Sequence, residues 1–387
     1  MTEAMDDPET GGGNAAGLLA AVGDLSPTME AEIRESERRG HLTDRSVRLL
    51  HRAGLFRMAW PVELGGPGLG LAQQVAVLNR LARVDATAAW NVAVGSLHTG
   101  FAGAYLSDEA VAEIWSGPEP VTAGQMAARG WAEPAEGGLV VGGEWSFASG
   151  MHQSNWVISG ARIRGGPLDG REIDFVVPVE AVEVDRASWE VMGLEATGSY
   201  DYRITRRFVP DGWWFPMPIA PRLRGGPLFD LPVPTQTLAL HLGVPLGAAR
   251  RSIEEVCRLA EAKQRDFSPT TIGARESFLT ELARMDCRVS AAELAADDLC
   301  RRIESGSGTG PMEMLLRGRA VTRWVTEVAL EVAVWALGQG GGQAARLDHP
   351  LQRIARDLLV ARQHVMVDEI ALAARGAQLM TEHAHGT

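Results

Sequence analysis

Residues 145–156 read W-S-F-A-S-G-M-H-Q-S-N-W and lie in the middle third of the 387-residue chain. Six of these residues carry a hydroxyl, an amide or an imidazole, and aromatic side chains stand among them. A small polar cluster with aromatic walls is what a flat heteroaromatic ligand needs. The same pattern also fits a strand, a Ser-Gly turn and a second strand without any ligand. The surrounding sequence therefore has to decide what this stretch does.

The chain changes character on either side of this stretch. Val, Ile and Thr separated by Gly turns predict an antiparallel sheet or small barrel over 119–232. Apolar residues at three- and four-residue steps predict an N-terminal helical domain over 25–118. Residues 1–24, acidic and rich in Gly, are expected to form a flexible leader. The remainder, 233–387, predicts a bundle of four long helices at 235–263, 269–304, 311–337 and 350–382.

Charge and cysteine usage narrow the classes of function. The net charge of -12 opposes a sequence-independent grip on nucleic acid phosphates, and no basic run appears. Cys257, Cys287 and Cys300 are far apart and show no metal-binding spacing, which indicates reduced thiols and no metal site. No apolar run approaches about 20 residues, so no membrane span is expected. We therefore expect a cytoplasmic protein that binds neither nucleic acid nor membrane.

Three motifs stand at residues 142–156, 189–202 and 349–364. Together they resemble the acyl-CoA dehydrogenase superfamily, and within it the group D two-component flavin-dependent monooxygenases. The first is G-G-E-W-S-F-A-S-G-M-H-Q-S-N-W at 142–156, which is similar to a flavin-contacting strand region. The second is W-E-V-M-G-L-E-A-T-G-S-Y-D-Y at 189–202, similar to the branch's W-x-x-x-G-x-x-x-T-G-S signature. The third is H-P-L-Q-R-I-A-R-D-L-L-V-A-R-Q-H at 349–364, similar to its last helix. The resemblance implies an α+β, acyl-CoA dehydrogenase-like fold with helical, antiparallel β and four-helix-bundle domains.

The last motif separates the two branches of the superfamily. Many acyl-CoA dehydrogenases carry a pattern like R-D-x-x-x-x-x-I-Y-E-G-T, and Arg356-Asp357 can be laid on its first pair. His364 then stands at the Tyr position and Val365 at the position of the catalytic Glu. Because Val cannot remove a proton, the match favours oxygen chemistry over desaturation. Some dehydrogenases carry their base on another helix, so a flavin dehydrogenase stays an alternative, as does a non-catalytic scaffold of the same fold.

The resemblance implies the oxygenase component of a two-component monooxygenase. Such a protein takes reduced FMN or FAD from a separate NAD(P)H flavin reductase. The flavin reacts with O2 to a C4a-hydroperoxyflavin, which oxygenates a small aromatic, amine or sulfur substrate. No strand-linked G-x-G-x-x-G with a following acidic residue is present, which agrees with a separate reductase. The resemblance also implies a homotetramer, and it does not distinguish FMN from FAD.

Two histidines are the catalytic candidates. For His364 the resemblance implies a hydrogen bond near the distal oxygen of the hydroperoxide, a task that imidazole suits near neutral pH. A helix His that faces solvent, or bonds to Asp357 or Asp368, is the alternative. His98 lies on an apolar and aromatic helix face, where it is either a base or substrate-orienting group or a core residue. Tyr105, two turns on, is the substrate-binding candidate, with core packing as its alternative.

The resemblance also implies the residues that contact the cofactor. These candidates are Ser149, Ser146, Gln125, Trp189, Thr197 and Arg265. Ser149 would touch the isoalloxazine edge through the Ser-Gly turn, Gln125 would bond the pyrimidine ring, and Trp189 would pack on the ring system. Arg265 is similar to an arginine that reaches a phosphate, although a solvated charge is equally consistent. His152, Trp213 and Trp214 are left without a role.

Overall fold

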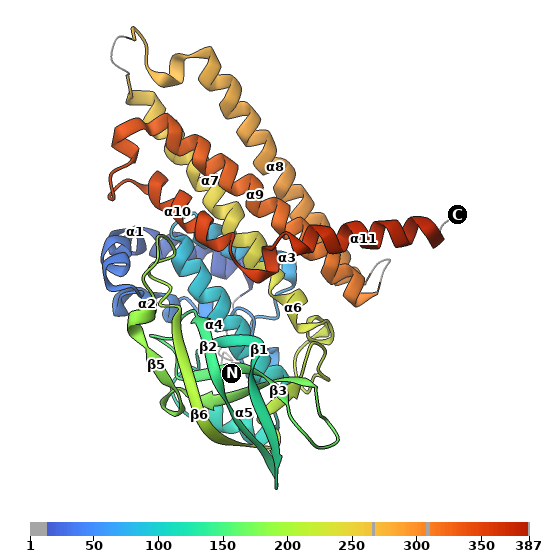
Figure 1. Ribbon diagram of the computed structural model, residues 1–387. Helices are drawn as coiled ribbons and strands as arrows, with labels where there is room; N and C mark the ends of the chain where they lie inside the picture. The colour runs from blue at the N-terminus through green and yellow to red at the C-terminus, as the bar shows by residue number, and fades with distance from the viewer. Residues whose placement is uncertain (1–13, 265–267, 307–309, 386–387) are drawn as a thin grey trace, which may run out of the picture.

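The computed structural model describes residues 14–264, 268–306 and 310–385. Figure 1 shows three regions, with N-terminal helices and a C-terminal bundle packed above a central sheet. The N-terminal helices are α1 (Ala15–Arg39), α2 (Asp44–Arg52), α3 (Leu71–Ala82), α4 (Ala86–Tyr105) and α5 (Asp108–Ile114). Helix α4 is buried along almost its whole length, and it packs against both the sheet and the bundle. It is therefore the element through which all three regions meet.

The first helix corrects the prediction of a leader over 1–24. Helix α1 begins at Ala15, and the side chain of Asn14 caps it by accepting from the Gly17 amide. Leu18, Val22 and Leu25 recur at helical spacing and are buried. This spacing indicates a helix, whereas the prediction of a leader relied on the composition of the segment. Residues 1–13 lie outside the described residues.

The central sheet is mixed, which corrects the expectation of a purely antiparallel one. Within the described residues it holds seven strands in the order β5-β6-β2-β1-β3-β4-β7, and β1 runs parallel to β3. The reason is the turn after β2, which carries the chain across β1 so that β3 starts beside the start of β1. The amides of Asn155 and Trp156 donate to the Val121 carbonyl and hold that crossing. The strands are β1 (Thr122–Ala135), β2 (Gly138–Ala148), β3 (Trp156–Ile163), β4 (Glu172–Pro178), β5 (Glu183–Asp185), β6 (Tyr200–Pro210) and β7 (Trp214–Pro216).

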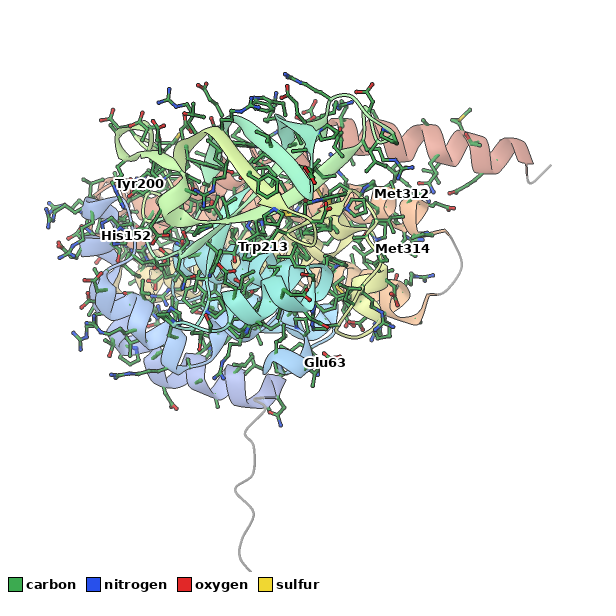
Figure 2. All side chains as sticks on the ribbon, turned by 90° about the horizontal axis from the view of Figure 1, so that it is seen from below. Glu63, His152, Tyr200, Trp213, Met312 and Met314 are labelled. Atoms are coloured by element: carbon green, nitrogen blue, oxygen red, sulfur yellow. The ribbon has the colours of Figure 1, made fainter. Side chains whose placement is uncertain are left out.

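The C-terminal helices form a bundle, which confirms the predicted fold class. The last predicted helix, 350–382, is divided into two helices. Its helices are α6 (Val233–Gln236), α7 (Leu238–Ala262), α8 (Glu276–Ser305), α9 (Pro311–Ala344), α10 (Pro350–Ala361) and α11 (Ile370–His385). A 3-10 turn, η7 (Val365–Val367), separates α10 from α11, so His364 caps a turn and does not lie on a helix. Arg319 and Arg323 of α9 hold that turn by donating to the carbonyls of Val365 and Val367. Helix α11 extends away from the rest of the molecule in Figures 1 and 2.

The loop between η4 (Arg186–Ser188) and β6 is docked onto α10 by the Arg-Asp pair. A Cβ on Gly193 would lie 2.3 Å from the Arg356 carbonyl oxygen, so the close approach requires glycine. Asp357 Oδ1 accepts from the Leu194 amide at 2.6 Å. Arg356 donates to the Met192 carbonyl at 2.7 Å and pairs with Glu195. The glycine of the W-x-x-x-G signature thus allows the loop to reach α10.

Gly193→Ala is expected to destabilise the fold because the new methyl group meets backbone atoms that cannot move aside. We expect a loss of about 1–3 kcal/mol in the free energy of unfolding, the usual range for overpacking. Gly226→Ala is the matched control, since nothing lies within 4 Å of its Cβ position. Urea unfolding of both variants measures the difference, and equal stabilities would contradict the docking argument.

Candidate functional site

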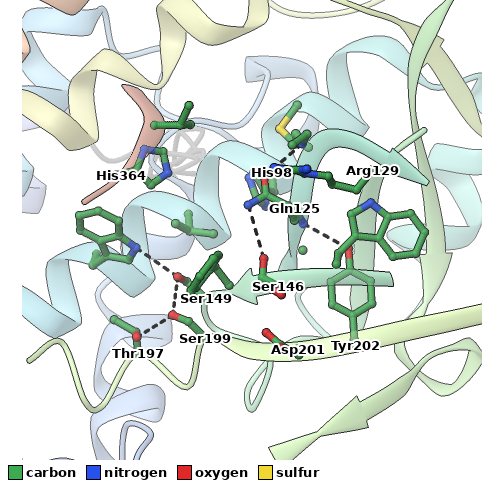
Figure 3. A pocket seen from close by; sticks show the side chains of 18 of the residues that line it. His98, Gln125, Arg129, Ser146, Ser149, Thr197, Ser199, Asp201, Tyr202 and His364 are labelled. Carbon is green, nitrogen blue, oxygen red and sulfur yellow. Dashed lines mark hydrogen bonds between the residues drawn. The ribbon is translucent and has the colours of Figure 1, made fainter. Parts of the chain in front are cut away.

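A cavity of about 1420 Å³ opens where α4, the sheet and the C-terminal helices meet. Figure 3 shows polar side chains from the strands on one side of it and imidazoles from the helical regions on the other. The structure brings most of the predicted site residues together in its lining. Those that line the cavity are His364, His98, Ser149, Ser146, Gln125, Trp189 and Thr197.

Of the other two predicted residues, one lies in the core and one lies outside the described part of the chain. Tyr105 is a buried core residue whose hydroxyl donates to the Phe229 carbonyl at 2.9 Å and accepts from Gln236 at 3.0 Å. Burial raises the pKa of Tyr105 to about 12. Because Tyr105 is absent from the cavity lining and its hydroxyl is already bonded, its substrate-binding role was wrong. Arg265 lies outside the described residues.

Hydroxyl groups gather on the strand side of the cavity. Ser149 Oγ lies 2.7 Å from Ser199 Oγ, which in turn lies 2.7 Å from Thr197 Oγ1. The indole Nε1 of Trp90 donates to Ser149 Oγ at 3.2 Å. Ser199 and Trp90 have no place among the predicted site residues, and both meet Ser149 across 50 or more residues of sequence. Figure 3 shows this row of hydrogen bonds.

An amide and two aromatic rings complete the strand side. Gln125 Oε1 accepts from the Ala127 amide at 3.1 Å, and its Nε2 donates to the Ser146 carbonyl at 3.5 Å. Trp189 donates its Nε1 to the Glu195 carbonyl at 3.0 Å, which fixes the plane of its indole. Phe147 packs edge-on against Trp189 and is held at a φ of 69°, a strained value for a non-glycine residue. The result is an aromatic-walled surface with a row of polar atoms.

The two predicted catalytic histidines face the same cavity as neutral imidazoles. Burial, with a smaller contribution from the Arg319 charge, lowers the pKa of His364 to about 4. Burial alone lowers the pKa of His98 to about 4. The Nδ1 of His364 accepts from the Met366 amide at 3.2 Å, so in the neutral ring Nε2 carries the proton. His98 Nδ1 is buried and has no hydrogen-bond partner within the described part of the chain.

His241 on α7 is a third imidazole that sequence reasoning missed. Its ring centroid lies 4.4 Å from that of His364 and 5.7 Å from that of Trp90. Burial, and then the neighbouring His364 and Arg319, hold its pKa well below the usual value. The available signal was a histidine inside the apolar run L-A-L-H-L-G-V-P. Only the fold reveals that this residue meets His364.

Arg129 is another residue that lines the cavity and that sequence reasoning missed. It lies on the edge of the cavity, in the part of β1 where the register with β3 shifts between Gln125 and Gly130. Its side chain is exposed and has neither a hydrogen bond nor an ion pair among the residues described. Its charge is therefore free to meet an anionic group of a ligand.

The residues present fit a flavin. The cavity exceeds the roughly 300–1,000 Å³ of an ordinary ligand pocket, which leaves room for a ring system and a second small molecule. The Trp90 and Trp189 indoles provide flat walls, and Ser149 and Gln125 provide polar atoms for a heteroaromatic edge. The unpartnered Nδ1 of His98 is a buried polar atom of the kind that a ligand satisfies. No group of three His, Cys, Asp or Glu side chains among the described residues is arranged to hold a metal ion.

In His98→Asn the free energy of unfolding is expected to fall less steeply with decreasing pH than in wild type. Between pH 6.5 and 4 the unfolded chain binds a proton that the folded imidazole excludes, because the folded pKa is about 4. The contribution of His98 to the free energy of unfolding is therefore fully present above the unfolded pKa. As the pH decreases below that pKa, this contribution falls by up to about 1.4 kcal/mol per pH unit. Urea unfolding from pH 4.5 to 7.5 should show wild type losing stability faster than the variant. Parallel curves would contradict the assignment.

Two family models match the chain. Residues 25–113 match the acyl-CoA dehydrogenase N-terminal domain, and residues 239–369 match the acyl-CoA dehydrogenase C-terminal domain. Together the two matches cover more than half of the chain. Within the described residues, no helix has the length and apolar character that crossing a bilayer requires.

Known proteins that are similar to this chain are named as hydroxylases and monooxygenases. A pigment production hydroxylase of Rhodococcus erythropolis is 26% identical, over 90% of this chain and 92% of its own length. An indole-3-acetate monooxygenase of Pseudomonas putida is 25% identical, over 90% of this chain and 89% of its own. The structure of XiaF from Streptomyces sp. in complex with FADH2 and glycerol superposes with a TM-score of 0.86, at 22% identity over 95% of this chain and 96% of that one. The two family models together show that the chain belongs to the acyl-CoA dehydrogenase superfamily, and the relatives described above are named as a hydroxylase and a monooxygenase.

Proposed function

We propose that the chain is the oxygenase component of a two-component monooxygenase, which uses reduced flavin and O2 to oxygenate a small aromatic substrate. One observation carries the proposal. A single cavity holds a polar, aromatic-walled edge from the strands and, facing it, neutral imidazoles from α4, α7 and the turn before η7. Relatives named for resorcinol and for indole-3-acetate support an aromatic substrate.

Reduced flavin, when bound, supplies the electrons that activate O2. Ser149 and Gln125 would hold the edge of its ring system, and the Trp189 indole would pack beside it. Arg129 offers its free charge to a phosphate, in addition to the Arg265 expected from the sequence. We propose these contacts for FMN and FAD alike, because both share the ring system and the first phosphate.

His364 would act as a hydrogen-bond donor to the oxygen that is transferred. Its Nδ1 is occupied by the Met366 amide, so Nε2–H is the group it can present. The turn that carries it is held by Arg319 and Arg323, and this fixes the direction of the ring. A fixed donor in a dry site stabilises negative charge on oxygen without reorganisation. Burial lowers the pKa of His364 to about 4, so the ring donates this hydrogen bond as a neutral imidazole near neutral pH.

His98 would orient the substrate by accepting a hydrogen bond from it. The buried, unpartnered Nδ1 can accept from a phenol hydroxyl or an indole N–H, and this hydrogen bond draws electron density toward the aromatic ring. The burial that keeps His98 neutral also excludes water from this end of the cavity. Water exclusion protects the activated oxygen from decay to hydrogen peroxide.

The partners follow from the same proposal. A separate NAD(P)H flavin reductase would supply the reduced flavin, because the chain carries no strand-linked nicotinamide fingerprint. We place the exposed apolar residues Ile370 and Met380 of α11, which are 65% and 71% exposed, in contacts of a homotetramer. The free cysteines Cys257, Cys287 and Cys300 suit the reducing cytoplasm.

A reconstitution assay tests the function. The protein is mixed with a generic flavin reductase, NADH, FMN or FAD, O2 and a panel of phenols and indoles. We expect a product with one added oxygen atom, with most of the NADH consumed appearing as product. Reduction of tightly bound oxidised FAD by an acyl-CoA would instead establish a dehydrogenase, and failure to bind flavin in either redox state would leave a scaffold.

His364→Ala and Ser149→Ala are expected to uncouple the reaction. Removal of the donor or of the edge contact should lower product per NADH by about tenfold or more and raise hydrogen peroxide correspondingly. Product is measured by mass spectrometry and peroxide by a peroxidase assay. His51→Ala, which lies outside the cavity, should couple as wild type does. Wild-type coupling in both site variants would remove these residues from the mechanism.

A further inference from the structure

His241 and His364 form a pair of buried imidazoles in the wall of the cavity. Their ring centroids lie 4.4 Å apart with the planes tilted by 42°, and no hydrogen bond joins the two rings within the described chain. The indole of Trp90 packs edge-on against both rings, at 5.7 Å and 5.8 Å. Trp90 and His98 are about two turns, or roughly 12 Å, apart on α4. The pair therefore lies away from the His98 end of the cavity.

Each ring of the pair offers the cavity one nitrogen. The Nδ1 of His364 accepts from the Met366 amide, so its Nε2 carries the proton. In His241 the Nε2 is buried without a partner, which leaves Nδ1 as the nitrogen that can reach the cavity. Because a buried N–H without an acceptor is rare in folded proteins, the proton of the neutral ring belongs on Nδ1. The pair thus presents two N–H donors side by side.

His241 is held on a rigid element. Helix α7 lies so close to α3 that a Cβ on Gly247 would come within 2.3 Å of the Asn79 carbonyl oxygen, and one on Gly243 within 2.7 Å of Leu78 Cβ. Such close contact fixes the helix against its neighbour. The donors on both rings are therefore in place before any ligand arrives, which is the condition for strong stabilisation of charge.

The charges around the pair favour an anion. Arg319 donates to the Val365 carbonyl at 2.7 Å, and its positive charge acts on both imidazoles. Burial is the main cause of the lowered pKa of both rings, and no carboxylate of the described chain contributes to either value. The acidic residues of the cavity lining all come from the strand side or its connections, and they are Glu144, Glu183, Asp185 and Asp201. The pair is thus a neutral donor site in a positive field.

Two N–H donors beside a guanidinium suit a small anion, since hydrogen bonds to a charged acceptor are about twice as strong as neutral ones. We propose that His241 and His364 together form a two-donor site for a small monovalent anion. His241 then supplies a second hydrogen bond to the negative charge that develops on the transferred oxygen. Only this second statement rests on the proposed function, because the site takes an anion whether or not flavin is bound.

Two substitutions of His241 separate hydrogen bonding from packing. His241→Phe keeps an aromatic ring against His364 and Trp90 but removes both ring nitrogens. His241→Asn loses the ring but keeps an N–H close to the position of Nδ1. His51→Phe is the matched control, because it makes the same change in a partly buried histidine that does not line the cavity.

Titration of the flavin-free protein with azide, in chloride-free buffer near neutral pH, tests the site. The protein is labelled with 15N-histidine, and NMR follows the ring nitrogens of His241 and His364, assigned from the signals lost in His241→Phe and His364→Ala. We expect both rings to respond with one dissociation constant in wild type and in His51→Phe. That constant should rise by about tenfold or more in His241→Phe, the scale of one hydrogen bond to a charged group. His241→Asn should stay close to wild type.

The coupling assay is the second readout. His241→Phe should release more hydrogen peroxide for each product molecule than His241→Asn, because only the amide replaces the lost donor. A role in packing alone would give the opposite order, since Phe keeps the ring contacts and Asn does not. Thermal unfolding of each variant confirms that folded proteins are compared.

The inference is overturned if azide leaves both rings unchanged, or if folded His241→Phe binds azide as tightly as wild type. Oxygenated product from the reconstituted wild type would then leave the proposed function standing. Azide binding that depends on His241, in a protein that binds no flavin and forms no product, would support the anion site and contradict the proposed function.

Discussion

The hydrogen bond from the Leu194 amide to Asp357 Oδ1, at 2.6 Å, joins the signature loop to α10. It holds Leu194 at a φ of 51°, a left-handed conformation that a branched side chain seldom adopts. Burial raises the pKa of Asp357 to about 7, which shows how costly this carboxylate is to place here. The Leu194 carbonyl accepts a hydrogen bond from the Thr197 hydroxyl at 2.8 Å. The contact between this loop and α10 thus fixes the carbonyl that accepts from the row of hydroxyls on the cavity wall.

The cavity depends equally on side chains that are kept uncharged. His98 and His364 come from segments far apart in the sequence, and each loses its charge to burial. A charged imidazole would draw water into a site whose chemistry requires dryness. The Arg319 and Arg323 guanidiniums lie close by, and they donate hydrogen bonds to the carbonyls of the turn after His364. Both arginines therefore shape the turn, and the charge of Arg319 also opposes protonation of His364.

Much of this arrangement could be predicted from the sequence, because patterns of burial repeat at fixed spacing. The order of helices, sheet and bundle followed from periodicity, and the resemblance in three motifs located Ser149, Thr197 and His364. What escaped prediction depended on contacts between distant segments. His241 and Ser199 belong to the site because of their contacts with His364 and Ser149. The Tyr105 hydroxyl is hydrogen-bonded to Phe229 and Gln236 in the core. The break before α11 was hidden because the arginines that hold it lie on another helix.

The most direct measurement is a crystal structure of the protein grown without oxygen in the presence of reduced FMN or FAD. We expect the isoalloxazine to lie in the cavity, with its edge against Ser149, the Trp189 indole beside it and His364 facing the same ring. A flavin bound elsewhere on the molecule, or one whose edge meets none of the Ser149–Ser199–Thr197 wall, would contradict it.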